Sequence, residues 1–166
     1  MSKHLYLLRH AQTLDKRQDE TDFDRQLTSI GSQNSTRMGR NLKQKEILPD
    51  IILSSPAVRA QATAEHVAEQ IAYDPFKIHY NHEIYNASVR TFLEVVNNMK
   101  KEWESVLIVG HNPSITYLAE YITGEAIGNM STCGLVHIEF EQDDWALMTE
   151  GTGIFKWYEY PDLLNF

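Results

Sequence analysis

A basic pair, Arg9 and His10, directly follows the apolar run 5–8, which predicts a short buried strand. An arginine guanidinium is a planar fork of N–H donors that fits a phosphate or a carboxylate. A neutral histidine offers a ring nitrogen that can act as a base, a metal ligand or a nucleophile. Because ligands of open α/β sheets bind beyond the carboxyl ends of the strands, this pair is placed for chemistry. On this stretch alone, a capping arginine beside a surface histidine is the alternative.

Two more basic residues follow later strands in the same way. His111 comes one glycine after the apolar run 105–109, before an Asn-Pro pair that can begin a helix with anion-favouring amide groups. Arg59 lies in the first turn of the helix expected after the run 50–54, off the apolar stripe of that helix. A structural loop histidine and a solvated surface arginine are the alternatives at these two positions.

The carboxyl ends of parallel strands meet at one edge of a sheet, so these residues are expected to converge there. The converging set is Arg9, His10, Arg59 and His111. Two arginines and two histidines around one point would make a cationic pocket that suits a phosphate group. The strand ends carry no acidic cluster and no Cys/His spacing that would hold a metal, so no metal is expected.

The elements that must position this set alternate between strand and helix. Apolar patterning predicts strands at 5–8, 50–54, 77–82 and 105–109, and helices at 28–47, 57–72, 88–99 and 113–123. Three further strands, at 133–140, 145–149 and 154–160, follow without long helices between them, which implies antiparallel pairing. The pattern predicts one α/β domain over residues 1–166. Its expected architecture is a three-layer α/β/α sandwich with a mostly parallel sheet and antiparallel edge strands.

Local signals refine the helices. The expected N-terminal caps are Thr28, Ser55, Ser88 and Asn112. Gly124 is the natural stop of the fourth helix. The buried side of the first helix is expected to comprise Ile30, Met38 and Leu42. Gly31 and Gly39 would let that helix pack closely on the sheet, and the charged stretch 15–26 before it should be an exposed loop.

Composition limits the partners and the compartment. The formal net charge of −8 argues against a nucleic-acid backbone or an anionic membrane as the main partner, although a small anionic ligand could still bind where basic residues converge. Cys133 is the only cysteine, so an intrachain disulfide is impossible, which fits a reducing cytosol. The N-terminal apolar run is too short for a signal peptide, and no segment reaches membrane-spanning length. We therefore expect a soluble cytoplasmic protein.

Four segments resemble, in order and spacing, motifs of the histidine phosphatase superfamily, which contains phosphoglycerate mutases and acid phosphatases. They are Leu-Arg-His-Ala at 8–11, Asp-Arg-Gln-Leu-Thr-Ser-Ile-Gly at 24–31, Ser-Ser-Pro-Ala-Val-Arg-Ala at 54–60 with Thr-Ala at 63–64, and Val-Gly-His-Asn-Pro at 109–113. More closely, the chain resembles the SixA-like branch of phosphohistidine phosphatases. The resemblance runs from about residue 3 to 140, and the aromatic tail after residue 143 carries no transferable motif.

This resemblance implies a phosphoglycerate mutase-like fold and a phosphatase domain in which His10 is the nucleophile and carries the phosphoryl group. Arg9, Arg59 and His111 would then hold the non-bridging oxygens, and no metal or organic cofactor is implied. Relatives that cleave alkyl phosphates use a carboxyl acid to protonate the leaving oxygen, and Glu83 is the candidate here. An ordinary loop glutamate is the alternative at that position.

The substrate expected from this resemblance is a phosphorylated protein or a small phosphoester. Phosphohistidine relaxes the need for an acid, because imidazole leaves more readily than an alkoxide. The chain is also too short for a large cap domain, so a protein side chain should reach the pocket. A non-catalytic module that binds phosphate or a phosphoprotein, and a mutase acting on a phosphorylated metabolite, are the alternative functions.

Overall fold

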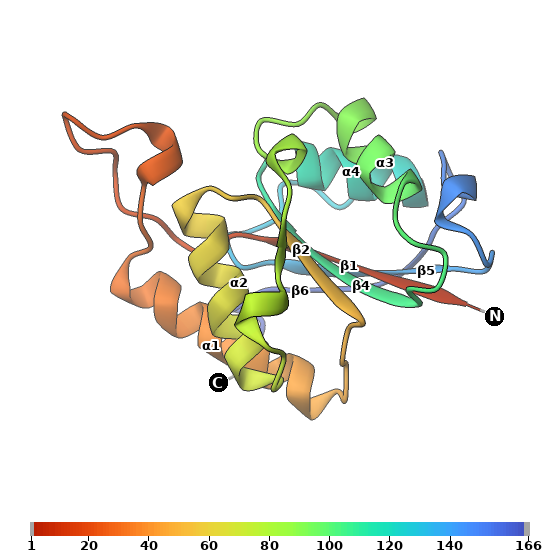
Figure 1. The fold of residues 1–166 in the computed structure, drawn as a ribbon, viewed down its shortest axis with the longest axis horizontal. Coiled ribbons are helices and arrows are strands. Elements are labelled where there is room, and N and C mark those ends of the chain that lie inside the picture. Colours follow the sequence, from red (N-terminus) through yellow and green to blue (C-terminus); the bar gives the residue numbers. More distant parts are fainter. Residues whose placement is uncertain (1, 165–166) are drawn as a thin grey trace.

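A six-stranded mixed sheet forms the central layer of the computed structural model, which describes residues 2–164 (Figure 1). Its strands are β1 (Lys3–Arg9), β2 (Ile51–Ser54), β3 (His79–Tyr80), β4 (Ser105–Gly110), β5 (Leu135–Phe140) and β6 (Ile154–Glu159). They lie in the order β3-β2-β4-β1-β5-β6. The first four of these positions are parallel, while β5 is antiparallel to both β1 and β6. The predicted mostly parallel sheet with antiparallel edge strands is confirmed.

Helices cover both faces of the sheet. They are α1 (Ser29–Gln44), α2 (Val58–Gln70), α3 (Val89–Asn97) and α4 (Ser114–Thr123), with short 3-10 turns η1 (Asp22–Asp24), η2 (Pro75–Lys77), η3 (His82–Ile84) and η4 (Trp145–Leu147). Figure 1 shows α1 and α2 on one face and α3 and α4 on the other, so the predicted three-layer α/β/α sandwich is confirmed. No helix within residues 2–164 is long and apolar enough to cross a membrane.

The alternation of side chains along each strand explains the two cores. On β1, Leu5 and Leu7 pack into the core beneath α3 and α4, while Tyr6 and Leu8 pack into the core beneath α1 and α2. All four side chains are buried, because a strand in the middle of this sheet is covered on both faces. The result is a rigid strand whose carboxyl end presents Arg9 and His10.

Several local predictions are wrong. The segment 145–149 contains the turn η4 (Trp145–Leu147) and no strand, because Asp144 caps the turn by accepting the N–H of Ala146 at 3.0 Å and Trp145 is fully buried. Ile30 is 58% exposed, since the buried side of α1 runs through Ser35, Met38 and Leu42 instead.

Gly31 and Gly39 of α1 were predicted to pack on the sheet, but they contact other parts of the chain. A Cβ at Gly39 would lie 2.8 Å from Cβ of Gln70 on α2, and one at Gly31 would overlap the carbonyl oxygen of Gln12. The close approach is therefore between α1 and α2, and between α1 and the chain after β1.

Two of the four predicted caps are confirmed. Thr28 and Ser88 accept backbone N–H groups of α1 and α3, and Gly124 ends α4 in the left-handed conformation with φ 73°. Ser55 and Asn112 are not caps, because α2 begins at Val58 and α4 at Ser114, with Ala57 and Pro113 in the cap positions. The side chains of Ser55 and Asn112 are thereby free to bond elsewhere.

Candidate active site

The strand ends bring the four predicted basic residues to one edge of the sheet. In the β1–β4 register Arg9 lies opposite Gly110, the backbone N–H of His10 donates to the Gly110 carbonyl at 3.1 Å, and the rings of His10 and His111 lie 5.2 Å apart. Strand β2 pairs with β4 on its other side. Helix α2 follows β2 in the chain and carries Arg59 in its first turn. We call Arg9, His10, Arg59 and His111 the basic site.

Unpaired nitrogens concentrate in the basic site. Among the described residues, four buried side-chain nitrogen or oxygen atoms lack a hydrogen-bond partner, and three of them are Arg9 Nε, Arg59 Nε and His111 Nδ1. Buried polar groups are almost always paired, because an unmade hydrogen bond costs the desolvation of the group. An anion with several oxygens would supply hydrogen-bond partners for these nitrogens on two guanidinium groups and one imidazole.

His10 is held with one ring nitrogen free to react. Its Nδ1 lies 2.8 Å from the carbonyl oxygen of Ala11, and a carbonyl only accepts, so Nδ1 carries the hydrogen and Nε2 keeps the lone pair. Burial, together with the charges of Arg59 and Arg9, lowers the pKa of His10 to about 4, although the bond to Ala11 opposes this shift. The imidazole is therefore neutral near pH 7, as a nucleophile must be.

His111 faces His10 from β4 and is also neutral. Burial is the main cause that lowers its pKa to about 3, and repulsion from a protonated His10 and from the charge of Arg59 adds to it. Its Nε2 lies 2.7 Å from Oγ of Ser55, which is fully buried between β2 and α2. Arg9 is fixed in turn by donating from Nη1 to the carbonyl of Met130 at 2.8 Å.

A carboxylate that the sequence analysis missed completes the arrangement. Asp22, on η1, accepts from Nη2 of Arg59 at 3.0 Å and from the hydroxyl of Tyr85 at 2.7 Å through the same oxygen, Oδ2. Its carbonyl oxygen also accepts from Nη1 of Arg59 at 2.6 Å. The bond from Tyr85 and the bond and charge of Arg59 lower the pKa of Asp22 to about 2, so it is ionised.

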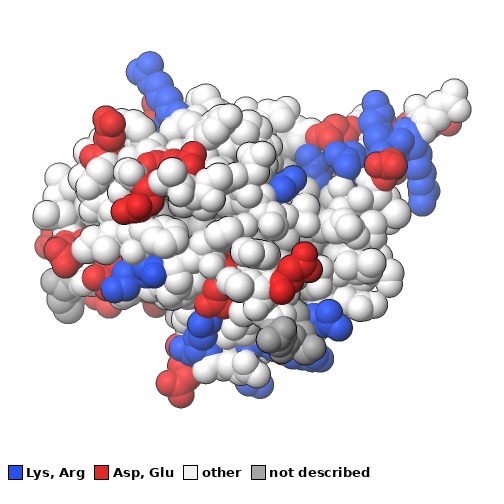
Figure 2. Space-filling model, turned by 180° about the vertical axis from the view of Figure 1, so that it is seen from behind, with Lys and Arg blue, Asp and Glu red and all other residues white. Residues whose placement is uncertain are grey.

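The loop that carries Asp22 is exposed, as predicted, but it is not free of the basic site. In Figure 1 the segment between β1 and α1 reaches away from the sheet and turns back through η1, and Figure 2 shows basic and acidic side chains mixed along it. The carboxylate of Asp22 holds the outer end of Arg59 and leaves Nε unpaired. Nothing in the sequence pattern pointed to Asp22, because its contacts join residues 37 and 63 positions apart.

Tyr85 is the second residue that the sequence analysis missed. Its ring meets the ring of His111 edge-on at 5.5 Å, and the guanidinium carbon of Arg59 lies 6.0 Å from its centroid. It also contacts Phe23 of the loop edge-on at 5.3 Å. Tyr85 therefore joins the two loops that flank the basic site.

Glu83 has no described bond to the basic site. It is exposed on η3 and lines a hollow beside β3 together with Leu53 and Trp103. Its backbone N–H donates to Asn81 at 2.9 Å. Across residues 2–164, no hydrogen bond or ion pair joins Glu83 to the basic site, so its role as an acid stays a prediction.

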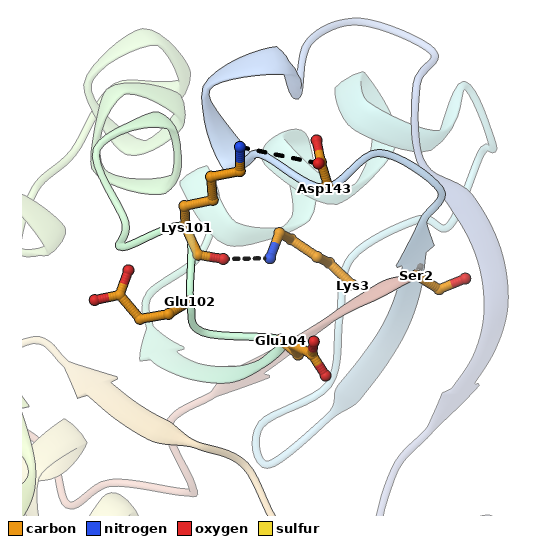
Figure 3. A pocket seen from close by; sticks show the side chains of 6 residues that line it. All are labelled: Ser2, Lys3, Lys101, Glu102, Glu104 and Asp143. Carbon is orange, nitrogen blue, oxygen red and sulfur yellow. Dashed lines mark hydrogen bonds and ion pairs between the residues drawn. The ribbon is translucent and has the colours of Figure 1, made fainter.

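A separate hollow lies at the opposite ends of the strands (Figure 3), where Lys3 begins β1. The Lys3 side chain is buried and donates to the carbonyl oxygens of Lys101 at 2.6 Å and Trp103 at 3.0 Å. These bonds tie β1 to the loop before β4, so the lysine has a structural role. The described part of the chain contains no group of three or more His, Cys, Asp or Glu side chains that could hold a metal ion.

Sequence comparisons relate the chain to known phosphatases. A profile of the "Histidine phosphatase superfamily (branch 1)" matches residues 5–81. An uncharacterised chloroplastic protein of Arabidopsis thaliana is 25% identical, over 94% of this chain and 76% of that protein. The mitochondrial serine/threonine-protein phosphatase Pgam5 of Drosophila ananassae is 34% identical over 77 residues, which are 46% of this chain and 26% of that protein.

Structural comparison extends the likeness to the whole sheet. A protein of Agrobacterium tumefaciens assigned as the phosphohistidine phosphatase SixA superposes with a TM-score of 0.82 at 28% identity, covering 96% of this chain and 98% of that one. A SixA protein histidine phosphatase solved with tungstate gives a TM-score of 0.83 at 23% identity, covering 96% and 97% of the two chains. The second of these supports the fold alone.

Proposed function

The chain belongs to the histidine phosphatase superfamily and is a phosphatase, and on that premise we propose that it hydrolyses phosphohistidine side chains of proteins through a phosphoryl intermediate on His10. One observation carries the mechanism: a neutral histidine with its Nε2 lone pair free lies among three buried nitrogens that lack partners. The residues of the basic site divide accordingly into one nucleophile and three groups that hold the phosphoryl oxygens.

The reaction takes two steps. In the first, Nε2 of His10 attacks phosphorus, the bond from phosphorus to the substrate imidazole breaks, and that imidazole leaves with the electron pair and takes up a proton. In the second, water attacks the phosphorus of phospho-His10, the phosphorus–Nε2 bond breaks, and inorganic phosphate leaves. Arg9, Arg59 and His111 stabilise the charge on the non-bridging oxygens in both steps.

The position of Glu83 favours phosphohistidine as the substrate. An alkoxide leaves poorly without an acid, and across residues 2–164 the carboxylate predicted for that role has no hydrogen bond or ion pair to the basic site and lines a different hollow. Imidazole leaves far more readily, so the basic site is sufficient for it. The likeness to the Agrobacterium protein, at 28% identity over 96% of the chain, supports the same substrate class.

Phosphoserine or phosphothreonine is the second candidate, because the serine/threonine-protein phosphatase Pgam5 is 34% identical to this chain over 77 residues. A small phosphoester substrate, a mutase reaction and non-catalytic phosphate binding remain the further alternatives. We also propose a reducing compartment such as the cytoplasm, supported by the absence of any cysteine besides the buried Cys133.

Labelling tests the nucleophile. Incubation with a 32P-labelled phosphohistidine peptide, quenched during turnover, should leave base-stable and acid-labile label on the wild-type chain and none on His10→Ala. His66→Ala, which changes a histidine outside the basic site, should label like the wild type. Label on His10→Ala would contradict the assignment, and activity that is lost in EDTA and restored by a divalent metal would contradict a metal-independent reaction.

A second experiment tests Glu83 and the substrate class together. If Glu83 is a proton donor, Glu83→Gln should slow alkyl phosphate hydrolysis about 10²–10⁴-fold. The same variant should keep most of its turnover on phosphohistidine and on para-nitrophenyl phosphate, whose leaving groups need little protonation. Equal losses on all three substrates would assign Glu83 to phosphate positioning or folding, and no loss on any would make it an ordinary loop glutamate.

A further inference from the structure

Ser55 makes two contacts that link the start of α2 to His111. Its hydroxyl oxygen accepts the backbone N–H of Ala57 at 3.2 Å and lies 2.7 Å from Nε2 of His111. The side chain is fully buried, so water does not supply it with a partner. Each hydrogen-bond donor in this small network therefore needs an acceptor on the protein itself.

The direction of the hydrogen bond between Ser55 and His111 follows from which donors can find an acceptor. If Nε2–H donated to Ser55, the oxygen would accept two N–H groups and the hydroxyl hydrogen would have no acceptor among the contacts of residues 2–164. If Ser55 donates to Nε2, the oxygen still accepts the N–H of Ala57 and every group between the two residues is paired. The second arrangement avoids a buried unpaired donor, which is costly.

This direction decides what His111 presents on its other side. The imidazole is neutral near pH 7, so a lone pair on Nε2 requires the hydrogen to be on Nδ1. Nδ1 is buried and has no partner, in a site with two unpaired arginine nitrogens. An N–H at that position attracts a phosphoryl oxygen, whereas a lone pair would repel it.

We propose that Ser55 is a positioning residue that holds His111 in the Nδ1–H tautomer, so that His111 donates a hydrogen bond to the phosphoryl group. Both rings then carry their hydrogen on Nδ1. That of His10 donates to the Ala11 carbonyl, whereas that of His111 has no protein partner and is available to the phosphoryl group. The identity of the anion rests on the proposed function, but the tautomer is a property of the free protein.

The tautomer can be read directly by NMR. In 15N-histidine-labelled protein at pH 7, the His111 signals, assigned by their absence in His111→Gln, should show a protonated Nδ1 and an unprotonated Nε2. Ser55→Ala should shift His111 toward the Nε2–H tautomer. Ser54→Ala, a control at the adjacent buried serine, whose hydroxyl donates to the Ser55 carbonyl, should keep the wild-type tautomer.

Kinetics supply the second readout. Ser55→Ala should lower kcat for phosphohistidine hydrolysis about tenfold and weaken competitive inhibition by inorganic phosphate, in parallel with the tautomer change. A wild-type His111 protonated at Nε2, or an unchanged tautomer in folded Ser55→Ala, would overturn the proposal. The wild-type spectrum decides the matter even if Ser55→Ala fails to fold. An Nδ1–H tautomer in a protein without phosphatase turnover would instead contradict the proposed function.

Discussion

His10 and His111 are buried, adjacent and neutral, yet each is committed to a different hydrogen-bonding pattern. The strand-end position of both residues could be predicted from the sequence, because apolar runs mark where β1 and β4 end. Their tautomers could not, since these depend on the Ala11 carbonyl and the Ser55 hydroxyl, whose positions are set by loop geometry. The residue types therefore predicted a phosphate site, whereas the different hydrogen bonds of the two histidines could be assigned only from their contacts in the structure.

The lowered pKa of His10 gives a direct prediction. In a phosphate-free NMR titration, the imidazole of His10 should stay neutral as the pH falls from 7 and should gain a proton only near pH 4. Burial and the charges of Arg59 and Arg9 disfavour the imidazolium, so the midpoint lies below the ordinary value of about 6.5. His10→Ala identifies the signal, and a midpoint near 6.5 would show that the ring is solvated in solution.

Truncation of Arg59 should reduce activity more than stability. Arg59→Ala is expected to lower kcat/KM about a hundredfold, because it removes a charged donor to the phosphoryl oxygens. Arg90→Ala is the matched control, since Arg90 pairs with Glu94 on the exposed side of α3 and should leave turnover unchanged. Urea unfolding measured alongside separates the two effects. Near-normal turnover in Arg59→Ala would remove this residue from the basic site.

The elements show where sequence patterning stops being informative. Strands and helices longer than about five residues were predicted to within a few residues, because their apolar spacing is repeated several times. The turn η4 was predicted as a strand, because a short apolar run does not distinguish an extended segment from a buried turn. The loop that carries η1 was predicted only to be exposed, although it supplies the carboxylate that holds Arg59.

That loop can be tested with two neighbouring aspartates. Asp22→Ala should lower kcat/KM about tenfold, because Arg59 loses the carboxylate that fixes the outer end of its guanidinium. Asp24→Ala is the control on the same turn, where the carboxylate accepts only from Thr21 at 2.8 Å among the side-chain bonds described for it. Asp24→Ala should retain wild-type turnover. Equal rates for both variants would mean that the backbone carbonyl of Asp22 is sufficient to position Arg59.

The contact between α1 and α2 predicts an unusual response to alanine. Gly39→Ala should destabilise the protein by about 1–2 kcal/mol, although alanine favours an isolated helix over glycine by about 1 kcal/mol. The added Cβ would lie 2.8 Å from Cβ of Gln70 and 3.1 Å from Cα of Val67, which forces the helices apart. Gln33→Ala, on the exposed side of α1, should change the free energy of unfolding by less than about 0.5 kcal/mol. A more stable Gly39→Ala would show that the helices move apart at little cost.

Across the whole molecule, buried histidines couple stability to pH. Burial is the largest cause that lowers the pKa values of His10, His111 and His137, to about 4, 3 and 4 respectively. The unfolded chain binds these protons near pH 6.5 while the folded chain does not. Stability is therefore fully present above about pH 7 and is lost progressively as the pH falls toward 3–4.

His137 offers a test of this coupling away from the basic site. Its ring stacks on Tyr6 at 4.4 Å, and its Nε2 lies 3.0 Å from Nδ1 of His4. Between pH 7 and 5, urea unfolding of His137→Gln should lose about 2 kcal/mol less stability than the wild type loses. Ile138→Val, a variant on the same strand without a titratable group, should keep the wild-type pH dependence. Parallel pH curves for His137→Gln and the wild type would contradict the coupling.

The register of β1 has a consequence for how the chain acquires activity. Leu5 pairs with Val106 on one side and with Ile138 on the other, so the strand that leads into His10 has partners that are synthesised more than a hundred residues later. Contacts of such high sequence separation require closure of long loops and form slowly. A nascent or partly folded chain therefore contains His10 without its neighbours and cannot bind phosphate. Turnover should appear only with the final cooperative folding step, which makes activity a stringent assay of complete refolding.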